Sequence, residues 1–295
     1  MKKVTRTAIA GMNIIAREQN IPQVVPKHTT FNEHLSIAEE LQLKDGEYTS
    51  FKGIMIGNGA HIVKMTDSQI AYFPTVAHRP MDTNLYNTIP VVLRREDDDL
   101  TLEQQKGYGL RTRMQYRGVW YIAYFLKRID VEDPTIKISR VRVVDGEEKV
   151  DLINFTSEDA NPTKPNLNLD TSAAVETLED DYVAVDNIVE VPLTQFDIQE
   201  LINVCNIVEG IDSMAIFSEL AIVHGVDRNV DVAGPTGEPY TFREVAVAQA
   251  VAYICEFKSY SSIKDEDVIT FNVGVTESLL TEHQEESAPN AVSEL

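Results

Sequence analysis

The sequence predicts an α+β protein. We expect a strand-rich N-terminal half with an antiparallel sheet, a helix-containing acidic C-terminal half, and extended arms at both termini. Three observations lead to this expectation. Residues 51–155 are rich in Val, Ile, Tyr and Phe and are punctuated by Gly and Pro, which is typical of strands joined by turns. Residues 194–257 carry apolar residues at helical spacing, and residues 151–295 hold most of the acidic side chains.

The first 30 residues, 1–30, are expected to form an extended arm. Their periodicity is weak, and Pro22 and Pro26 favour extended backbone. An arm of this kind has to dock on another surface, so both prolines are candidate interaction residues. The next segment, residues 32–42, has apolar residues at helical spacing and predicts one short helix.

A β-rich domain is expected over residues 31–155. A short apolar strand that begins at Gly53 ends at the Gly57-Asn58-Gly59 turn. A hairpin that turns at Arg117-Gly118 leads into an aromatic-rich strand with the single tryptophan of the chain, Trp120. Residues 136–144 alternate imperfectly between apolar and basic residues and predict a further strand. Antiparallel pairing of these strands is the simplest expectation.

A boundary follows this domain. Residues 156–180 are polar and contain prolines, so they predict a linker or a long loop. The next domain, residues 181–275, is expected to begin with a strand at 182–193 and to end with a strand at 268–275, with about three helices between them. Residues 276–295 predict a flexible acidic tail.

The three helices are expected to pack into one core. The second begins at Asp212 or Ser213, either of which can cap it, and stops at Gly225. The third spans residues 244–257, because Thr241 and Glu244 have the spacing of a capping box. The first spans residues 194–208 and carries an apolar stripe of Ile198, Leu201, Ile202, Cys205 and Val208.

The net charge of −21 is unevenly distributed. Residues 1–150 hold 21 Lys or Arg and 19 Asp or Glu, whereas residues 151–295 hold 5 and 28. This acidity would repel nucleic acid and anionic membranes, and it would either keep the chain in solution or steer it to a basic partner. No apolar run has the length of a membrane span, so we expect the chain to fold in the cytosol. Cys205 and Cys255 lack the spacing of zinc ligands and are expected to be buried apolar residues.

The residue types that perform catalysis do not form a known pattern. The glycine-rich turns lack the Lys-Ser/Thr of a phosphate-binding loop, and the six histidines lack the spacing of a zinc protease helix. The carboxylates of Glu96-Asp97-Asp98-Asp99 lack EF-hand spacing and are expected to form a solvated turn or to contact a basic partner. We therefore expect no catalytic residue, no cofactor and no metal. Two other interpretations stay open: a metal-dependent enzyme in which His61, His78 and some of Asp97–Asp99 converge, and an acidic mimic of nucleic acid.

Several strings of the sequence resemble a known family. They are Ile56-Gly-Asn-Gly-Ala-His61, the segment from His78 to Arg94, Tyr108-Gly-Leu-Arg111, the segment from Trp120 to Arg128, and the segment from Phe217 to Arg228. They are similar to virion proteins of tailed bacteriophages with contractile tails, which are usually described as structural or baseplate components. The likeness touches residues 50–130 and 195–260.

The resemblance implies a structural subunit of a virion, folded and assembled in the host cytoplasm. It implies a wedge component of the tail baseplate that acts through protein–protein contacts, with a head–tail connector or neck protein as the alternative. The implied partners are other tail or baseplate proteins and copies of the chain itself, and the resemblance carries over no catalytic residue. The candidate interaction residues lie in the two arms and the acidic turn: Pro22, Pro26, Asp97, Asp98, Asp99, Glu282, Glu285 and Glu286.

Overall fold

The structure is a computed structural model. It describes residues 2–29, 32–36, 39–66, 71–130, 136–144, 147–158, 160–162, 182–210, 215–233, 238–261 and 266–278. The chain forms two compact units. The first unit consists of Met1–Asp130 and Pro192–Val268, and the second of Val131–Val191 and Ile269–Leu295. The expected domains, 31–155 and 181–275, do not coincide with these units, because each unit joins segments that lie far apart in the sequence.

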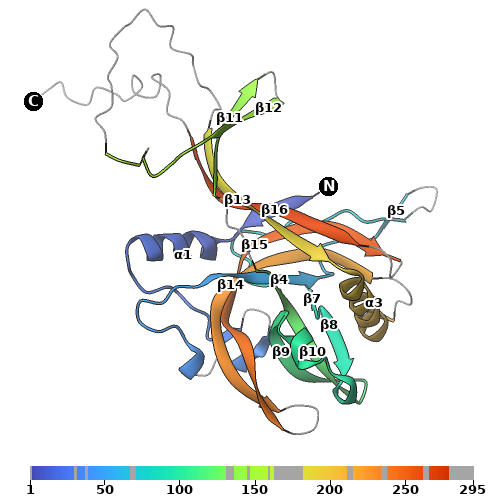
Figure 1. The fold of residues 1–295 in the computed structure, drawn as a ribbon. Coiled ribbons are helices and arrows are strands. Elements are labelled where there is room, and N and C mark those ends of the chain that lie inside the picture. The colour runs from blue at the N-terminus through green and yellow to red at the C-terminus, as the bar shows by residue number, and fades with distance from the viewer. Residues whose placement is uncertain are drawn as a thin grey trace, which may run out of the picture. The chain divides into compact units, whose positions relative to one another are not determined.

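The first unit is built on an antiparallel sheet of eight strands. The strand order is β1-β15-β14-β4-β10-β8, with β7 paired to β4 and β9 paired to β10 (Figure 1). The protein is mostly β, and strands span the whole chain rather than the N-terminal half alone. The strands of this sheet are β1 (Lys3–Arg6), β4 (Ser50–Gly57), β7 (Thr88–Ile89), β8 (Val92–Arg95), β9 (Tyr108–Tyr116), β10 (Val119–Arg128), β14 (Ala215–Ala233) and β15 (Pro239–Tyr260).

The two longest strands, β14 and β15, occupy the segments where the second and third helices were expected, so both helix predictions are wrong. Residues 215–223 and 245–251 are almost wholly buried on both faces of the sheet. A strand buried on both faces has no polar residue at every second position, and periodicity cannot distinguish it from a buried helix. Thr241 of the expected capping box instead donates to Asp231 across the β14–β15 hairpin, at 3.2 Å.

Gly225, the expected helix stop, is a strand residue beside a register shift in the β14–β15 pairing. A Cβ at this position would lie 2.5 Å from Cγ1 of Val245 and 2.8 Å from the carbonyl oxygen of Ala246. Glycine is therefore required here by the close approach of β15, and not by the end of a helix.

The N-terminal segment is not the extended arm that the sequence predicts. β1 pairs with β15, and α1 (Ala8–Glu18) follows it with Thr7 as its N-cap. The buried face of α1 consists of Ala10, Asn13 and Ala16, and the Asn13 amide donates to Gln249 of β15 at 3.0 Å. Small and polar residues on the inner face hide the helical period of this segment.

α3 (Gln195–Glu209) confirms the helix expected at residues 194–208. A capping box of Thr194 and Asp197 begins it, and Gly210 in the left-handed conformation ends it. Asp197 also accepts from Lys127 of β10 at 2.8 Å, which ties the first turn of the helix to the sheet. Its buried apolar residues are Ile198, Leu201, Val204 and Cys205, whereas Ile202 and Val208 of the expected stripe are half-buried.

The remaining elements of the first unit are short. The helix expected at residues 32–42 is wrong, because the chain forms β3 (Asn32–Ser36), paired with β2 (His28–Thr29), and a 3-10 turn, η1 (Glu39–Leu41). The others are β5 (Lys64–Met65), β6 (Ala71–Tyr72), η2 (Glu96–Asp98) and α2 (Leu102–Gln105). None of the helices that the structure describes is long and apolar enough to cross a membrane.

The expected hairpin of the N-terminal half is confirmed. β9 and β10 pair with Tyr116 opposite Val119, and Arg117 and Gly118 form the turn, both with positive φ. This is the backbone that a two-residue hairpin turn requires. The hairpin joins the sheet through β10, which pairs with β4 and β8. Residues of both hairpin strands contribute to a buried apolar core of Met55, Leu85, Leu110, Leu126, Ala221, Val223, Val245, Ala248, Ala250 and Tyr253.

The second unit contains a sheet of four strands in the order β12-β11-β13-β16. Three of these strands, β11, β13 and β16, confirm the strands expected at 136–144, 182–193 and 268–275. The residues expected as a linker lie mostly outside the described residues, as does the tail beyond Ser278. The four strands are β11 (Lys137–Val144), β12 (Glu147–Ile153), β13 (Tyr182–Leu193) and β16 (Asp267–Ser278).

His224 couples the fold of the first unit to pH. It lies on β14, with its ring edge-on to that of Phe51. Burial lowers the pKa of His224, and the positive charges of Arg17, Lys52 and Arg6 lower it further, to about 4. The folded chain therefore keeps this ring neutral at a pH where the unfolded chain, with the ordinary pKa of 6.5, is already protonated.

We expect mild acid to destabilise the fold through His224. From pH 6.5 to pH 5 the unfolded chain binds a proton here and the folded chain does not, so the free energy of unfolding falls by about 2 kcal/mol. The His224→Gln variant should lose this part of the pH dependence, as measured by urea unfolding at about pH 7.5, 6.5 and 5. An equal decrease in both proteins would contradict the assignment.

Candidate functional site

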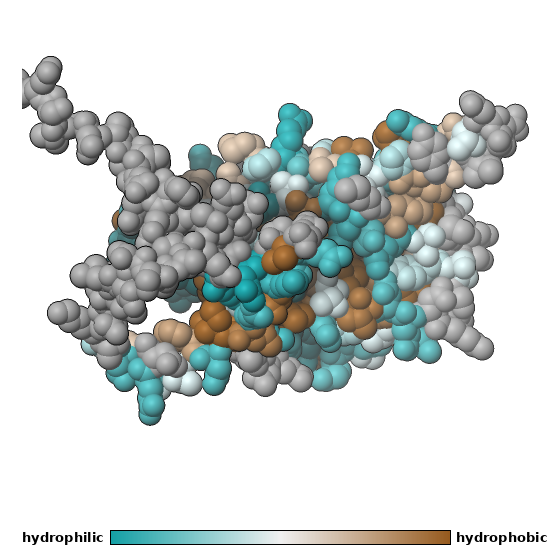
Figure 2. All heavy atoms as spheres, turned by 90° about the horizontal axis from the view of Figure 1, so that it is seen from above, coloured by the Kyte–Doolittle hydropathy of each residue, from teal (hydrophilic) through white to brown (hydrophobic). Residues whose placement is uncertain are grey.

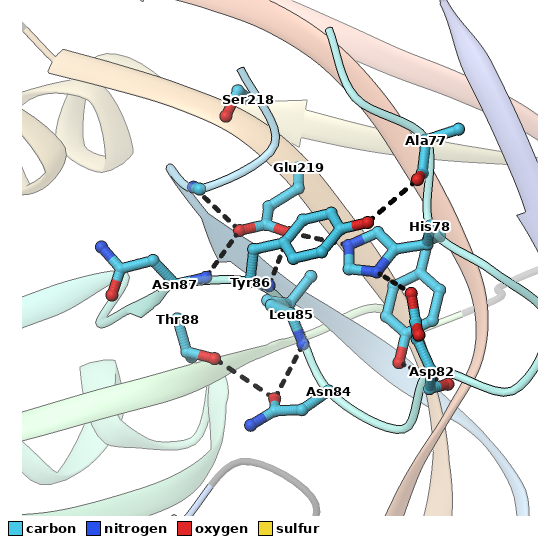
Figure 3. A network of polar contacts seen from close by, with 12 residues as sticks. Ala77, His78, Asp82, Asn84, Leu85, Tyr86, Asn87, Thr88, Ser218 and Glu219 are labelled. Atoms are coloured by element: carbon cyan, nitrogen blue, oxygen red, sulfur yellow. Dashed lines mark hydrogen bonds and ion pairs between the residues drawn. The ribbon is translucent and has the colours of Figure 1, made fainter. Parts of the chain in front are cut away.

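The most concentrated polar network of the first unit surrounds Glu219, whose side chain is completely buried. Glu219 lies on β14 opposite Gly57 of β4 and Cys255 of β15. A carboxylate in the middle of a sheet is unstable unless donors surround it, because burial removes its hydration. The donors come from the loop between β4 and β5 and from the loop between β6 and β7. Figure 3 shows His78, Tyr86 and Asn87 around the Glu219 carboxylate.

Four N–H groups donate to the two oxygens of Glu219. Oε1 accepts from the backbone of Gly59 at 2.9 Å and of Asn87 at 3.0 Å. Oε2 accepts from the backbone of Tyr86 at 2.9 Å and from Nε2 of His78 at 2.8 Å. These four hydrogen bonds satisfy the carboxylate, so the network fixes two loops against β14.

His78 is held between two aromatic rings and two carboxylates. Its ring stacks on Tyr86 and Tyr253, with centroids 4.1 and 3.9 Å away. Nδ1 lies 3.3 Å from Asp82, which also accepts from the N–H of Arg79 at 2.8 Å. The N–H of Arg79, and after it the contact with His78, lower the pKa of Asp82. Both ring nitrogens of His78 therefore face carboxylate oxygens, which only accept hydrogen bonds when they are ionised.

The Gly57-Asn58-Gly59 turn has a packing role that its sequence does not reveal. A Cβ on Gly57 would lie 2.5 Å from Oε1 of Glu219, and a Cβ on Gly59 would lie 2.6 Å from Cβ of Tyr86. Any side chain at either position would displace Glu219 or the loop that donates to it. Both glycines are required by close approach rather than by a positive φ.

His61 lies beside this network but is not part of it. Its Nδ1 is 2.9 Å from the hydroxyl of Ser218, the residue before Glu219. Its ring contacts Phe73 and Phe257 edge-on, with centroids 6.0 and 5.0 Å away. Ser218 is fully buried, so the Ser218–His61 pair does not present a nucleophile to a substrate.

The two histidines that the sequence singled out thus contact neighbouring residues of β14, but Asp97–Asp99 do not join them. Asp97 pairs with Arg95 and Asp98 with Arg94, while both oxygens of Asp99 are occupied by Arg111 and Tyr124. Among the described residues, no group of three or more His, Cys, Asp or Glu side chains could hold a metal ion. The geometry therefore lacks the convergence that the metal-dependent enzyme requires.

The expected acidic turn is partly correct. The side chains of Asp97 and Asp98 are solvent-exposed, whereas that of Asp99 is fully buried. Asp99 accepts from Arg111 at 2.9 Å and from the hydroxyl of Tyr124 at 2.8 Å, so it holds the acidic turn to β9 and β10. It has no free oxygen for a partner.

The other expected interaction residues lie at the ends of the chain. Pro22 is exposed and Pro26 is half-buried, both in the connection between α1 and β2. Pro22 lines a cavity of about 460 Å³ between this connection and residues 42–48. Glu282, Glu285 and Glu286 lie outside the described residues.

A second carboxylate, Asp227, joins four strands. It lies on β14 and accepts from Lys52 of β4 at 2.9 Å, from Arg128 of β10 at 2.7 Å and from Arg243 of β15 at 2.8 Å. Burial acts to raise the pKa of Asp227, but the hydrogen bonds from Lys52 and Arg128 lower it to about 2. The three cations give the network an excess of positive charge.

Sequence reasoning missed Glu219 because it placed this residue in a helix that ends at Gly225, and it missed Asp227 because it expected no strand after that helix. The available signal was a single acidic residue, Glu219, inside the apolar run 215–223. An isolated carboxylate in such a run has to find donors if it is buried. The donors themselves come from loops, and no spacing in the sequence connects them to Glu219.

Comparison with known proteins gives a family but no activity. A family model described as a family of unknown function (DUF7208) matches residues 1–288. No curated protein and no solved structure matches the chain.

Replacing Glu219 with glutamine should destabilise the protein. In either orientation of the amide, its NH2 group meets backbone N–H donors, so at least one of them loses its acceptor. We expect Glu219→Gln to lower the free energy of unfolding by about 3 kcal/mol. Chemical unfolding monitored by circular dichroism measures this change.

The matched control is Asp231→Asn, an exposed carboxylate on the same strand. This control should change the free energy of unfolding by less than about 0.5 kcal/mol. Equal stability of Glu219→Gln and the wild type would show that the network does not hold the fold.

Proposed function

Because the chain belongs to the DUF7208 family, whose function is unknown, we propose its function from the geometry of its residues and from the resemblance of its sequence strings to virion proteins of tailed phages. The chain is a structural subunit of a phage virion, a wedge component of the tail baseplate that acts through protein–protein contacts. Its partners are other tail or baseplate proteins and copies of itself, and its location is the virion.

The observation that carries the protein–protein contacts of this proposal is the apolar surface of the second unit, whereas the assignment to a virion depends on the sequence resemblance. All seven residues of β12 are solvent-exposed, among them Val150 at 58% and Leu152 at 74%. Ile136, which precedes β11, and Phe155, which follows β12, are 69% and 54% exposed. Neighbouring exposed apolar side chains on a single sheet layer are typical of a surface that another protein covers.

Apolar side chains also reach the surface of the first unit. Met12 and Ile15 lie on the exposed face of α1, and Met81 lies in the loop that contains His78. Figure 2 shows hydrophobic residues at several places between hydrophilic ones on the face that it draws. Contacts on both units suit a subunit with more than one neighbour.

The polar networks support a structural role as well. The side chains of Glu219 and His78 have no exposed surface. Asp99 and Asp227 form ion pairs with Arg and Lys side chains of the sheet. These groups stabilise the strand arrangement and leave no reactive atom at a surface. The strings that resemble tailed-phage virion proteins, including Ile56–His61 and the segments that begin at His78 and Phe217, meet at this network.

Charge favours protein partners over nucleic acid. The second unit, Val131–Val191 and Ile269–Leu295, holds 5 Lys or Arg and 20 Asp or Glu. This charge repels phosphate backbones, and it complements a basic protein surface. A head–tail connector in the same virion would use the same kind of surface, so the position in the particle has to be measured.

The location is tested on purified virions of the phage that encodes the chain. We expect the protein in gradient-purified particles at a fixed ratio to the tail proteins, with antibody labels at the baseplate in electron micrographs. Labels at the head–tail junction would assign the connector role instead. Particles that are complete and infectious without the protein would refute the proposal.

The role of the apolar surface is tested by changing it. A variant with Leu152→Ser and Phe155→Ser should fold normally, because both residues are exposed, and should be incorporated into virions about tenfold less. The control is Leu102→Ser, because Leu102 is also exposed but lies on α2 of the first unit. Equal incorporation of both variants would show that this surface is not a contact.

A further inference from the structure

One edge of β12 has no partner among the strands that the structure describes. In the four-stranded sheet it pairs with β11 alone, from Ile153 opposite Ile138 to Glu147 opposite Val144 (Figure 1). No other described strand pairs with it, and all seven of its residues are exposed. An exposed edge of this length presents unpaired N–H and C=O groups that can pair with another strand.

The middle of β12 carries exposed apolar side chains, which are more stable against another strand than in water. Val150 lies opposite Val141 of β11, and Leu152 lies opposite Ser139, so both point to the same face of the sheet. Val141 and Ser139 are buried, whereas Val150 and Leu152 are mostly exposed. The apolar face that begins on β11 therefore continues to the free edge.

The charges of β12 are unbalanced within the chain. Lys149 lies directly opposite Arg142 of β11, and like charges in this position are destabilising. Asp151 forms an ion pair with Arg142, but Lys149 has no hydrogen bond or ion pair with any residue that the structure describes. A partner strand that brings a carboxylate opposite Lys149 would relieve this repulsion.

We propose that β12 pairs in antiparallel register with β12 of a second copy of this chain, about a two-fold axis at Val150. In this register Lys149 lies opposite Asp151 of the second copy, and the reciprocal pair forms on the other side of the axis. An axis one residue earlier would place Lys149 against itself, and an axis one residue later would place Asp151 against itself. Of these three registers, the axis at Val150 is the one that places opposite charges across from each other and avoids like charges.

The same register completes the apolar face. The two Val150 side chains meet at the axis, and each Leu152 is a diagonal neighbour of Val150 of the second copy. Together with Val141 on each side they form a cluster that crosses the interface. Joining the two four-stranded sheets in this way makes one sheet of eight strands, without a free β12 edge.

The proposal deepens the proposed function, because it names a copy of the chain as one partner of the structural subunit. It is tested on the purified full-length chain without any virion component. Failure of dimerisation would overturn this register and leave incorporation into virions to be decided by the particle experiment.

Cysteine cross-linking tests the register. In the Val150→Cys variant the two Cys side chains face each other at the axis, so mild oxidation should give a disulfide-linked dimer. In Leu152→Cys the two positions are offset by four residues, about 13 Å, which is too far for a disulfide. The native Cys205 and Cys255 are buried and should not interfere. Monomer alone from Val150→Cys, or equal cross-linking of both variants, would overturn the register.

Charge exchange tests the contacts. Lys149→Asp alone sets two Asp against two Asp, and Asp151→Lys alone sets two Lys against two Lys. Each variant should weaken the dimer at least about tenfold in sedimentation equilibrium. An equimolar mixture should restore it, because each interfacial pair is then one Asp and one Lys. Monomeric wild type at up to about 1 mM chain, or single variants that dimerise as well as wild type, would overturn the proposal.

Discussion

The buried carboxylate of Glu219 is the constraint that organises the first unit. A negative charge in the middle of a sheet has to be surrounded by donors, and here three of the four donors are backbone N–H groups of loops. Those loops can approach only because Gly57 and Gly59 lack side chains. The loops that carry Gly59, Tyr86 and Asn87 are thereby fixed against β14.

Other buried carboxylates repeat this arrangement along the sheet. Asp227 joins β14 to β4, β10 and β15, Asp99 holds the acidic turn to β9 and β10, and Asp197 anchors α3 to β10. Each pairs with a cation from another strand, so the pairs specify which strands lie side by side. These carboxylates face inward, while apolar side chains of α1 and β12 are exposed to solvent. This distribution fits a subunit that is completed by its neighbours.

The elements that could be predicted from the sequence are those with a local cause. The β9–β10 hairpin depends on Arg117 and Gly118, which are adjacent in the chain, and α3 depends on a stripe within 15 residues. The prediction of helices at β14 and β15 was wrong because both segments are apolar on both faces, so their periodicity does not distinguish a strand from a helix. The prediction of an extended N-terminal arm was wrong because α1 buries the polar Asn13 and exposes the apolar Ile15, so its sequence lacks the usual helical pattern. In each case burial was decided by elements far away in the sequence.

The sequence by itself determined that the N-terminal half is rich in antiparallel strands, that the acidity belongs to the second half, and that α3 and the hairpin form. It contained no known catalytic pattern, and it singled out His61 and His78. Only the tertiary structure decided that these histidines contact Ser218 and Glu219, and that the edge of β12 carries an unbalanced Lys149. The physical reason is that donors, acceptors and free edges belong to pairs of segments. The sequence of a single segment predicts its own turns and periodicity, but it does not predict which strand lies beside it.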